Sequence, residues 1–287
     1  ISTSETSLIP ISISSDLDQT REKWFSSPYS LVTHLDLSPD GETVALTARG
    51  AVFSVPVDGG RIATIADDAD ARYREASFLP TTSRIVALSD KSGELEFESL
   101  SQDGLSKEKS ITDDGEVFRS DMAVSPTGER VAYVDKNYRL FSLDVRSGKS
   151  TLITQSPFDA PFDLTWSPNG EWLAYSLAAE NGHTQIWLYE VHTKSKITAT
   201  SDRVYSNSPT WSRDGDWLFF LSDRHLTTSV ESPWGRWQPE PYVVDTTQVF
   251  ALALNKDTRP PWLKKNEVEN TKKDPIISLP PSDDDTA

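Results

Sequence analysis

The sequence contains no cysteine. This absence excludes disulfide bonds, thiolate metal sites and cysteine nucleophiles, and it leaves the redox compartment of the protein undetermined. Methionine is almost as scarce, with Met122 as the single copy, and the chain begins at Ile1. We therefore expect the sequence to be a piece of a longer protein, so that any signal peptide would lie outside it.

Long apolar runs and an excess of basic residues are also missing. No apolar stretch approaches the roughly 20 residues that a membrane-spanning helix needs. The 28 Lys and Arg residues are outnumbered by 44 Asp and Glu residues, which gives a formal net charge of -16. This charge repels phosphate backbones and anionic lipid head groups, so we expect neither nucleic acid nor a membrane as a partner.

Sequence motifs of common active sites are absent as well. The chain has no HExxH pair, no GxSxG elbow and no GxxxxGK[ST] phosphate loop. The acidic run at 67–70 lacks the Gly and the distal Glu of an EF-hand loop and is interpreted as a solvated turn. We predict no catalytic residue, no metal site and no cofactor; a Ser-His-Asp triad built from turn residues is the weakest hypothesis. The four histidines, none at metal-ligand spacing, are His34, His183, His192 and His225.

What is present is a repeated unit. Each copy has an alternating strand, a turn of the Ser-Pro-Asp/Asn-Gly type and a second strand, a combination typical of a hairpin. Successive anchor positions (Pro39, Pro80, Pro126, Pro168 and Arg213) lie 41, 46, 42 and 45 residues apart. This spacing is in the range of roughly 40 to 50 residues for propeller blades. The copies are LDLSPDGETVAL (35–46), SFLPTTSRIVAL (77–88), MAVSPTGERVAY (122–133), LTWSPNGEWLAY (164–175) and PTWSRDGDWLFF (209–220).

A third strand follows in every unit, and a short edge strand such as SKITAT (195–200) completes four. We therefore predict an all-β fold, a β-propeller of TolB/WD40-like four-stranded blades. Residues 1–32 are a lead-in with one strand at 9–14, and residues 259–287 are a Pro-rich charged linker. The five predicted blades span 33–70, 71–114, 115–156, 157–201 and 202–258.

Aspartates recur directly after the second strand of three units, at Asp90, Asp135 and Asp223. They are either carboxylates that line one face of the propeller or residues of a hairpin turn. We favour the turn, because Asp side chains stabilise turns by bonding to nearby backbone amides.

The fifth unit is interrupted between its second and third strands by about twenty residues, which include SPWGRWQPEP (232–241). Loops of this length without secondary structure of their own are usually functional or disordered, and rigid aromatic side chains argue against disorder. The insertion either covers its own blade or contacts a ligand or another domain, and both alternatives stay open. The candidate substrate-binding residues are Trp234, Arg236, Trp237 and Tyr242.

Several longer strings resemble bacterial homologues of tricorn protease, in their second propeller. These strings are SDLDQTREKWFSSP (15–28), LSPDGETVALTARGAVFSVPV (37–57), RYREASF (72–78) and LSDRHLTTSVESPWGRWQPEPY (221–242). The resemblance runs in order through about residue 262. It implies a seven-bladed ring, with about five blades in this chain, in a protease whose serine-peptidase core lies downstream and has no counterpart here.

The resemblance implies a non-catalytic segment that admits or sorts unfolded peptides toward that absent core. Its expected partners are peptides, other domains of the parent protease and further copies in a homo-oligomer. We expect a cytoplasmic protein, with a periplasmic or otherwise exported parent as the alternative. The competing hypothesis is a stand-alone TolB-like propeller that acts as a protein-protein interaction module.

Overall fold

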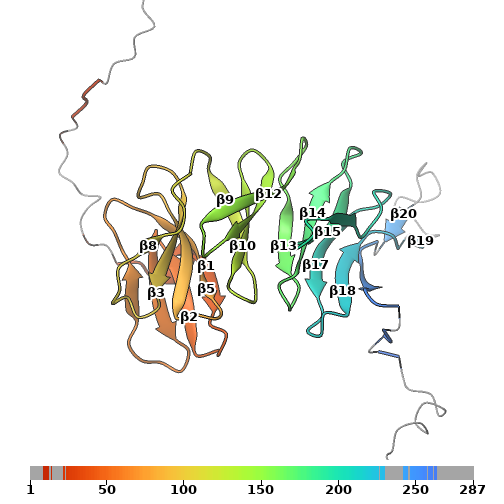
Figure 1. The fold of residues 1–287 in the computed structure, drawn as a ribbon, viewed down its shortest axis with the longest axis horizontal. Helices are drawn as coiled ribbons and strands as arrows, with labels where there is room; N and C mark the ends of the chain where they lie inside the picture. Colours follow the sequence, from red (N-terminus) through yellow and green to blue (C-terminus); the bar gives the residue numbers. More distant parts are fainter. Residues whose placement is uncertain are drawn as a thin grey trace, which may run out of the picture.

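The computed structural model describes residues 9–12, 14, 22, 24–225, 227–229, 242–244, 246–256, 258–260 and 262–263. These residues form five antiparallel sheets that follow one another in a row, with the first and the fifth at opposite ends, and a separate two-stranded sheet beside the fifth (Figure 1). Each of the five sheets in the row corresponds to one repeat unit, and we number these sheets as blades 1 to 5. The all-β propeller prediction is confirmed.

Blades 1 and 2 each contain four strands in sequence order. A short 3-10 helix, Pro28–Leu31, precedes them. The strands of blade 1 are β1 (Val32–Leu37), β2 (Thr43–Ala48), β3 (Ala51–Pro56) and β4 (Ala63–Ala66). The strands of blade 2 are β5 (Tyr73–Leu79), β6 (Arg84–Ser89), β7 (Glu96–Ser101) and β8 (Lys109–Ser110).

Blades 3 and 4 repeat this arrangement, whereas blade 5 has three strands among the described residues. The strands of blade 3 are β9 (Arg119–Val124), β10 (Arg130–Asp135), β11 (Arg139–Asp144) and β12 (Lys149–Gln155). Those of blade 4 are β13 (Phe162–Trp166), β14 (Trp172–Ala178), β15 (Thr184–Glu190) and β16 (Lys196–Thr198). Those of blade 5 are β17 (Ser206–Trp211), β18 (Trp217–Ser222) and β21 (Gln248–Ala253).

The turn between the first and second strand of a blade is held by its own residues. In blade 1 the Gly41 amide donates to the Ser38 carbonyl at 2.8 Å, and the Thr43 amide donates to the Ser38 hydroxyl at 2.9 Å. Gly41 has a φ of 76°, a conformation that glycine adopts without steric cost. Blades 3, 4 and 5 repeat both bonds, which explains why the sequence motif located these turns correctly.

The apolar cores lie between neighbouring blades. In β6, Ile85 and Ala87 pack toward blade 1, whereas Val86 and Leu88 pack toward blade 3. Both faces of an inner blade are therefore buried, which accounts for continuous apolar runs where strict alternation would leave one face to solvent. Two further cores join blade 3 to blade 4 and blade 4 to blade 5.

The strand expected at 9–14 is not found. Residues 9–12 and 14 are described, have no strand assignment and are exposed, with Ile9 76% accessible. A strand needs a neighbour with which to bond, and the described pairs of blade 1 are all made among β1 to β4. Most of the predicted linker at 259–287 lies outside the described residues, so the proposed boundaries of lead-in and linker stay predictions.

Candidate functional site

The first strands of the five blades form a continuous wall. β1 packs against β5, β5 against β9, β9 against β13 and β13 against β17. Sheets arranged radially converge toward the axis, so strands that approach one another in this way are the inner ones. A surface cavity of about 530 Å³ opens on this first-strand wall over β1, β5 and β9.

Every strand of the first-strand wall is irregular. Each shows a register shift against the second strand of its blade, and four of them carry a non-glycine residue with positive φ, namely Glu75, Asp121, Asp163 and Ser208. Such bulges bend a strand and redirect its side chains. The Asp163 carboxylate accepts the Ser208 amide at 2.8 Å, so two successive bulges are tied to each other.

One place on the wall has the outline of a hydrolase triad. The His34 Nε2 atom lies 3.1 Å from the Ser77 hydroxyl, and its Nδ1 atom lies 3.2 Å from the Glu75 carboxylate. The hydrogen bond with Glu75 raises the pKa of His34 above its ordinary value, and the same bond lowers the pKa of Glu75. This grouping could not be predicted from the sequence, because His34 comes from blade 1 and the other two residues come from blade 2.

The surroundings of this grouping do not support acyl transfer. Ser77 is only 8% exposed, and the amides on either side of it already donate. The Phe78 amide bonds to the Asp36 carboxylate at 2.7 Å, and the Ala76 amide bonds to the Thr47 hydroxyl at 3.2 Å. An oxyanion hole needs amide donors that are held ready for the reacting oxygen. We therefore interpret the grouping as a polar tie between blades 1 and 2.

The insertion of blade 5 begins and ends in a short ladder. β19 (Thr227–Ser229) and β20 (Tyr242–Val244) pair with each other in antiparallel fashion beside blade 5 (Figure 1). Tyr242 is thus a residue of β20. The other candidates, Trp234, Arg236 and Trp237, lie outside the described residues, so a substrate-binding role for all four stays a prediction.

The aspartates after the second strands bond in different ways. Asp135 accepts the amides of Asn137 and Arg139 at 2.9 and 3.1 Å and is a hairpin-turn residue, as predicted. Asp90 instead accepts the Arg72 amide of the preceding connection at 2.6 Å, and Asp223 accepts the Thr247 hydroxyl across the base of the insertion. All three therefore hold backbone or loop in place.

The acidic run at 67–70 has the contacts of a turn. Asp68 accepts the Asp70 amide at 3.2 Å and pairs with Lys91 at 3.0 Å. The described residues contain no group of three His, Cys, Asp or Glu side chains arranged to hold a metal ion. The same part of the chain has no helix with the length and apolar character that crossing a bilayer requires.

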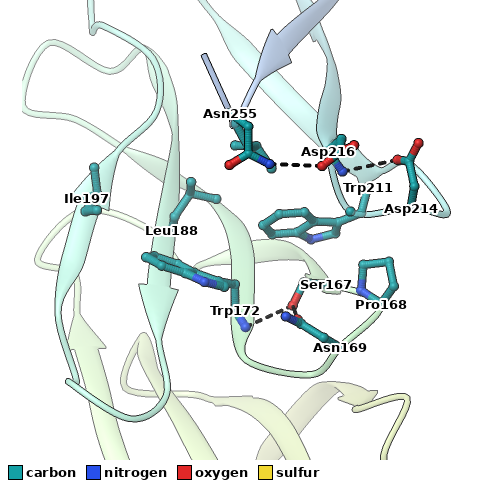
Figure 2. Close-up of a pocket in the computed structure, with 12 residues that line it drawn as sticks. Ser167, Pro168, Asn169, Trp172, Leu188, Ile197, Trp211, Asp214, Asp216 and Asn255 are labelled. Carbon is teal, nitrogen blue, oxygen red and sulfur yellow. Dashed lines mark hydrogen bonds between the residues drawn. The ribbon is translucent and has the colours of Figure 1, made fainter. Parts of the chain in front are cut away.

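A second cavity lies between blades 4 and 5, at the end where the first and second strands turn. This blade 4–5 pocket has a volume of about 560 Å³. Figure 2 shows the Trp172 and Trp211 side chains extending toward the same space, with Ile197 on one side and Asp214 on the other. The insertion leaves from the opposite end of β18, so the two features are separate.

The pocket exists because the two turns stand further apart here than at the neighbouring junction. At the blade 3–4 junction, a methyl group on Gly170 would lie 3.0 Å from Thr127. At the blade 4–5 junction, a methyl group on the corresponding Gly215 would lie 3.8 Å from Pro168. Asn169, which stands where blade 3 has Thr127, bonds within its own turn to Ser167 and Glu171.

Hydrogen bonds hold the walls of the pocket. The Trp211 indole donates to the Thr165 carbonyl at 3.2 Å, and the Asp216 carboxylate accepts the Asn255 amide at 2.9 Å. The Ser212 hydroxyl and the Asp216 amide both donate to the Asp214 carboxylate. Sequence reasoning missed this pocket. The available signal was that only units 4 and 5 place a Trp on each side of the turn. Of these four, Trp172 after the blade 4 turn and Trp211 before the blade 5 turn line the pocket.

The region that contains the repeats matches a known protein family. The family model described as the Tricorn protease second beta propeller domain matches residues 32–279. A tricorn protease homolog of Saccharolobus solfataricus is 30% identical over 189 residues, which are 65% of this chain and 17% of that protein. Tricorn protease homolog 1 of Streptomyces coelicolor is 28% identical over 215 residues, which are 70% of this chain and 19% of that protein.

The fold comparison agrees with the sequence comparison. A crystal structure of the tricorn protease superposes with a TM-score of 0.70 at 18% identity, over 82% of this chain and 22% of that one. The chain therefore spans about a fifth of the length of each of these three relatives. These matches do not favour the stand-alone TolB-like module. The bacterial source and the count of seven blades stay predictions.

Proposed function

This chain belongs to the family of tricorn protease second β-propeller domains, and from that premise we propose that it admits and sorts unfolded peptides toward a peptidase core carried elsewhere in the parent protein. The match over residues 32–279 is the observation that carries the proposal. A ring of blades with a narrow axial opening selects extended chains, because a folded protein is too wide to enter.

The first-strand wall supports a guiding role. Its cavity is lined by polar groups such as His34 and Asp36 together with apolar residues of β9 such as Met122, a mixture suited to extended chains of varied sequence. Carboxylates of two wall strands help to hold this surface in one shape, since Asp36 of blade 1 accepts the Phe78 amide of blade 2 and Asp163 of blade 4 accepts the Ser208 amide of blade 5. A preformed surface binds without an ordering cost of its own.

The partners follow from the same proposal. Peptides are the ligands, and other domains of the parent protease cover the remaining faces. A homo-oligomeric parent would enclose the peptide path further. We also propose that the protein is cytoplasmic.

A binding titration tests the proposal. We expect a labelled, unstructured peptide of about twenty residues to bind this chain without being cleaved, read by fluorescence anisotropy and mass spectrometry on the same samples. Trp234→Ala or Trp237→Ala should weaken binding by about tenfold, because a contact made by a Trp side chain contributes on the order of 1 to 2 kcal/mol.

The control removes a tryptophan elsewhere. Trp24 is fully exposed in the lead-in, so Trp24→Ala changes the tryptophan content without touching the insertion. Absence of peptide binding by the unsubstituted chain would contradict the admitting role. Binding that both insertion variants retain in full would instead contradict the part assigned to Trp234 and Trp237.

A further inference from the structure

The blade 4–5 pocket combines apolar walls with an acidic rim. Leu188 lies in the core between the two blades, with Trp172, Trp211 and Leu254 packed against it. Asp214 and Asp216 border the same space from the blade 5 turn. A ligand that fills such a pocket has an apolar stem and a cationic end.

We propose that this pocket binds the arginine or lysine side chain of a peptide, and the proposal rests on the peptide-admitting function in naming a peptide as the ligand. Long basic side chains bury their methylene stems along apolar surface and keep the charged group at the rim. Guanidinium and ammonium groups also bind to the faces of Trp rings, which are the best aromatic partners for cations.

The charge of the rim favours a cation over a neutral apolar side chain. The residues that line the pocket, all within the described part of the chain, include two carboxylates and no Lys, Arg or His. The Ser212 hydroxyl, together with the Asp216 amide, holds the pKa of Asp214 below its ordinary value, so Asp214 is ionised at neutral pH. A neutral side chain would leave both carboxylates without a partner from the ligand.

The turn of blade 5 offers a substitution that removes charge and keeps shape. In blade 4 the corresponding position is Asn169, whose side-chain oxygen accepts the Ser167 hydroxyl at 2.6 Å and the Glu171 amide at 3.1 Å. Asp214 accepts the equivalent two bonds through its Oδ1 atom. Asp214→Asn therefore reproduces a turn that the chain already forms.

A matched control exists in blade 1. Asp40 accepts the Ser38 hydroxyl and the Glu42 amide in the same turn and does not line the pocket. Asp40→Asn removes the same charge from the same kind of turn at a distant junction. A difference between Asp214→Asn and Asp40→Asn thus reports on the pocket and not on net charge.

The test uses N-acetyl-arginine amide and its citrulline counterpart, which has the same shape without the charge. Binding to the 287-residue chain is followed by NMR through the indole N–H signals, with those of Trp172 and Trp211 assigned by substitution to Phe. We expect the arginine compound to shift these two signals at millimolar concentration and to bind about tenfold more tightly than the citrulline compound. Asp214→Asn should weaken arginine binding about threefold, and Asp40→Asn should leave it unchanged.

Two results would overturn the proposal. One is equal binding of the arginine and citrulline compounds, and the other is an equal effect of the two Asp→Asn substitutions. Both readouts use a small compound, so they are independent of whether a long peptide binds through the insertion. The pocket can therefore fail while the admitting function stands, and the reverse outcome is equally distinguishable.

Discussion

At the scale of single residues, the polar side chains of the first-strand wall tie one blade to the next. His34 of β1 contacts both Glu75 and Ser77 of β5, and Asp36 accepts an amide of the same strand. These bonds cross the blade 1–2 junction beside its apolar core. The ionisation of His34 and Glu75 therefore contributes to how firmly blades 1 and 2 are joined.

The first prediction concerns the pH dependence of this pair. Because the pKa of His34 is raised, its stabilising contribution is complete below its ordinary value of 6.5 and is lost as pH rises through the raised pKa. Because the pKa of Glu75 is lowered, its contribution is complete above its ordinary value of 4.5 and is lost as pH falls through the lowered pKa. The pair thus stabilises the chain most between these two ordinary values.

Glu75→Gln tests this window. We expect the pKa of His34, followed by NMR, to fall toward its ordinary value, although Asp36 still contributes to raising it. The variant should lose about 0.5 kcal/mol of unfolding free energy near pH 5.5 and almost none at pH 9, since both side chains are partly exposed. Asp121→Asn removes a charge from the corresponding bulge of β9 and serves as the control. An unchanged His34 pKa in Glu75→Gln would show that the pair does not interact.

At the scale of elements, the sequence specified strands and turns well and specified their packing poorly. The turn at 38–43 was predictable because its bonds are local, between residues at most five positions apart. The triad-like grouping was not predictable, because it depends on which side chains of two blades meet. The blade 4–5 pocket was missed for the same reason, since it depends on the distance between two turns.

One junction is held by a buried charge. Arg119 of β9 is 5% exposed and pairs with Glu96 of β7 at 3.1 Å and with Asp114 at 2.6 Å. Its guanidinium carbon also lies 5.4 Å from the ring centroids of Phe97 and Tyr133. This side chain therefore joins blades 2 and 3 by charge, hydrogen bonds and ring contacts together.

The second prediction removes that charge. Arg119→Met should lower the unfolding free energy by about 3 to 5 kcal/mol, because it leaves the buried Glu96 carboxylate without its cationic partner. Adding Glu96→Gln should recover at least about 1 kcal/mol, as the unpaired charge is then gone. Urea unfolding followed by tryptophan fluorescence measures both values.

The comparison for Arg119→Met is an exposed ion pair. Lys91 contacts Asp68 and Glu108 at the surface, and Lys91→Met should destabilise the chain much less than Arg119→Met, because exposed ion pairs contribute little. If Arg119→Met is no less stable than Lys91→Met, then burial does not make the unfolding free energy depend more strongly on Arg119 than on Lys91.

At the scale of the whole molecule, five blades have four interfaces between them. Each inner blade buries both faces, whereas blades 1 and 5 lie at opposite ends of the row and each has a neighbouring blade on one face (Figure 1). In β1, His34 and Asp36 point toward blade 2, so the alternating Leu35 and Leu37 point away from it and are 59% and 55% exposed. In β21, Phe250 packs toward blade 4, and the adjacent Val249 is 70% exposed.

The last prediction follows from these two end faces. Exposed apolar surface of this kind mediates association in water, so the isolated chain should self-associate end to end, and its weight-average mass in sedimentation equilibrium should rise with concentration. Leu35→Lys combined with Val249→Lys should weaken this association by about tenfold, because charged residues are disfavoured in the centre of an interface. Leu105 is 80% exposed in the connection between β7 and β8, so Leu105→Lys adds a charge away from both ends and should have no effect. If the chain stays monomeric at every concentration, then its exposed apolar end faces do not cause association and the prediction is wrong. Association that the double variant retains would place the contact elsewhere on the molecule.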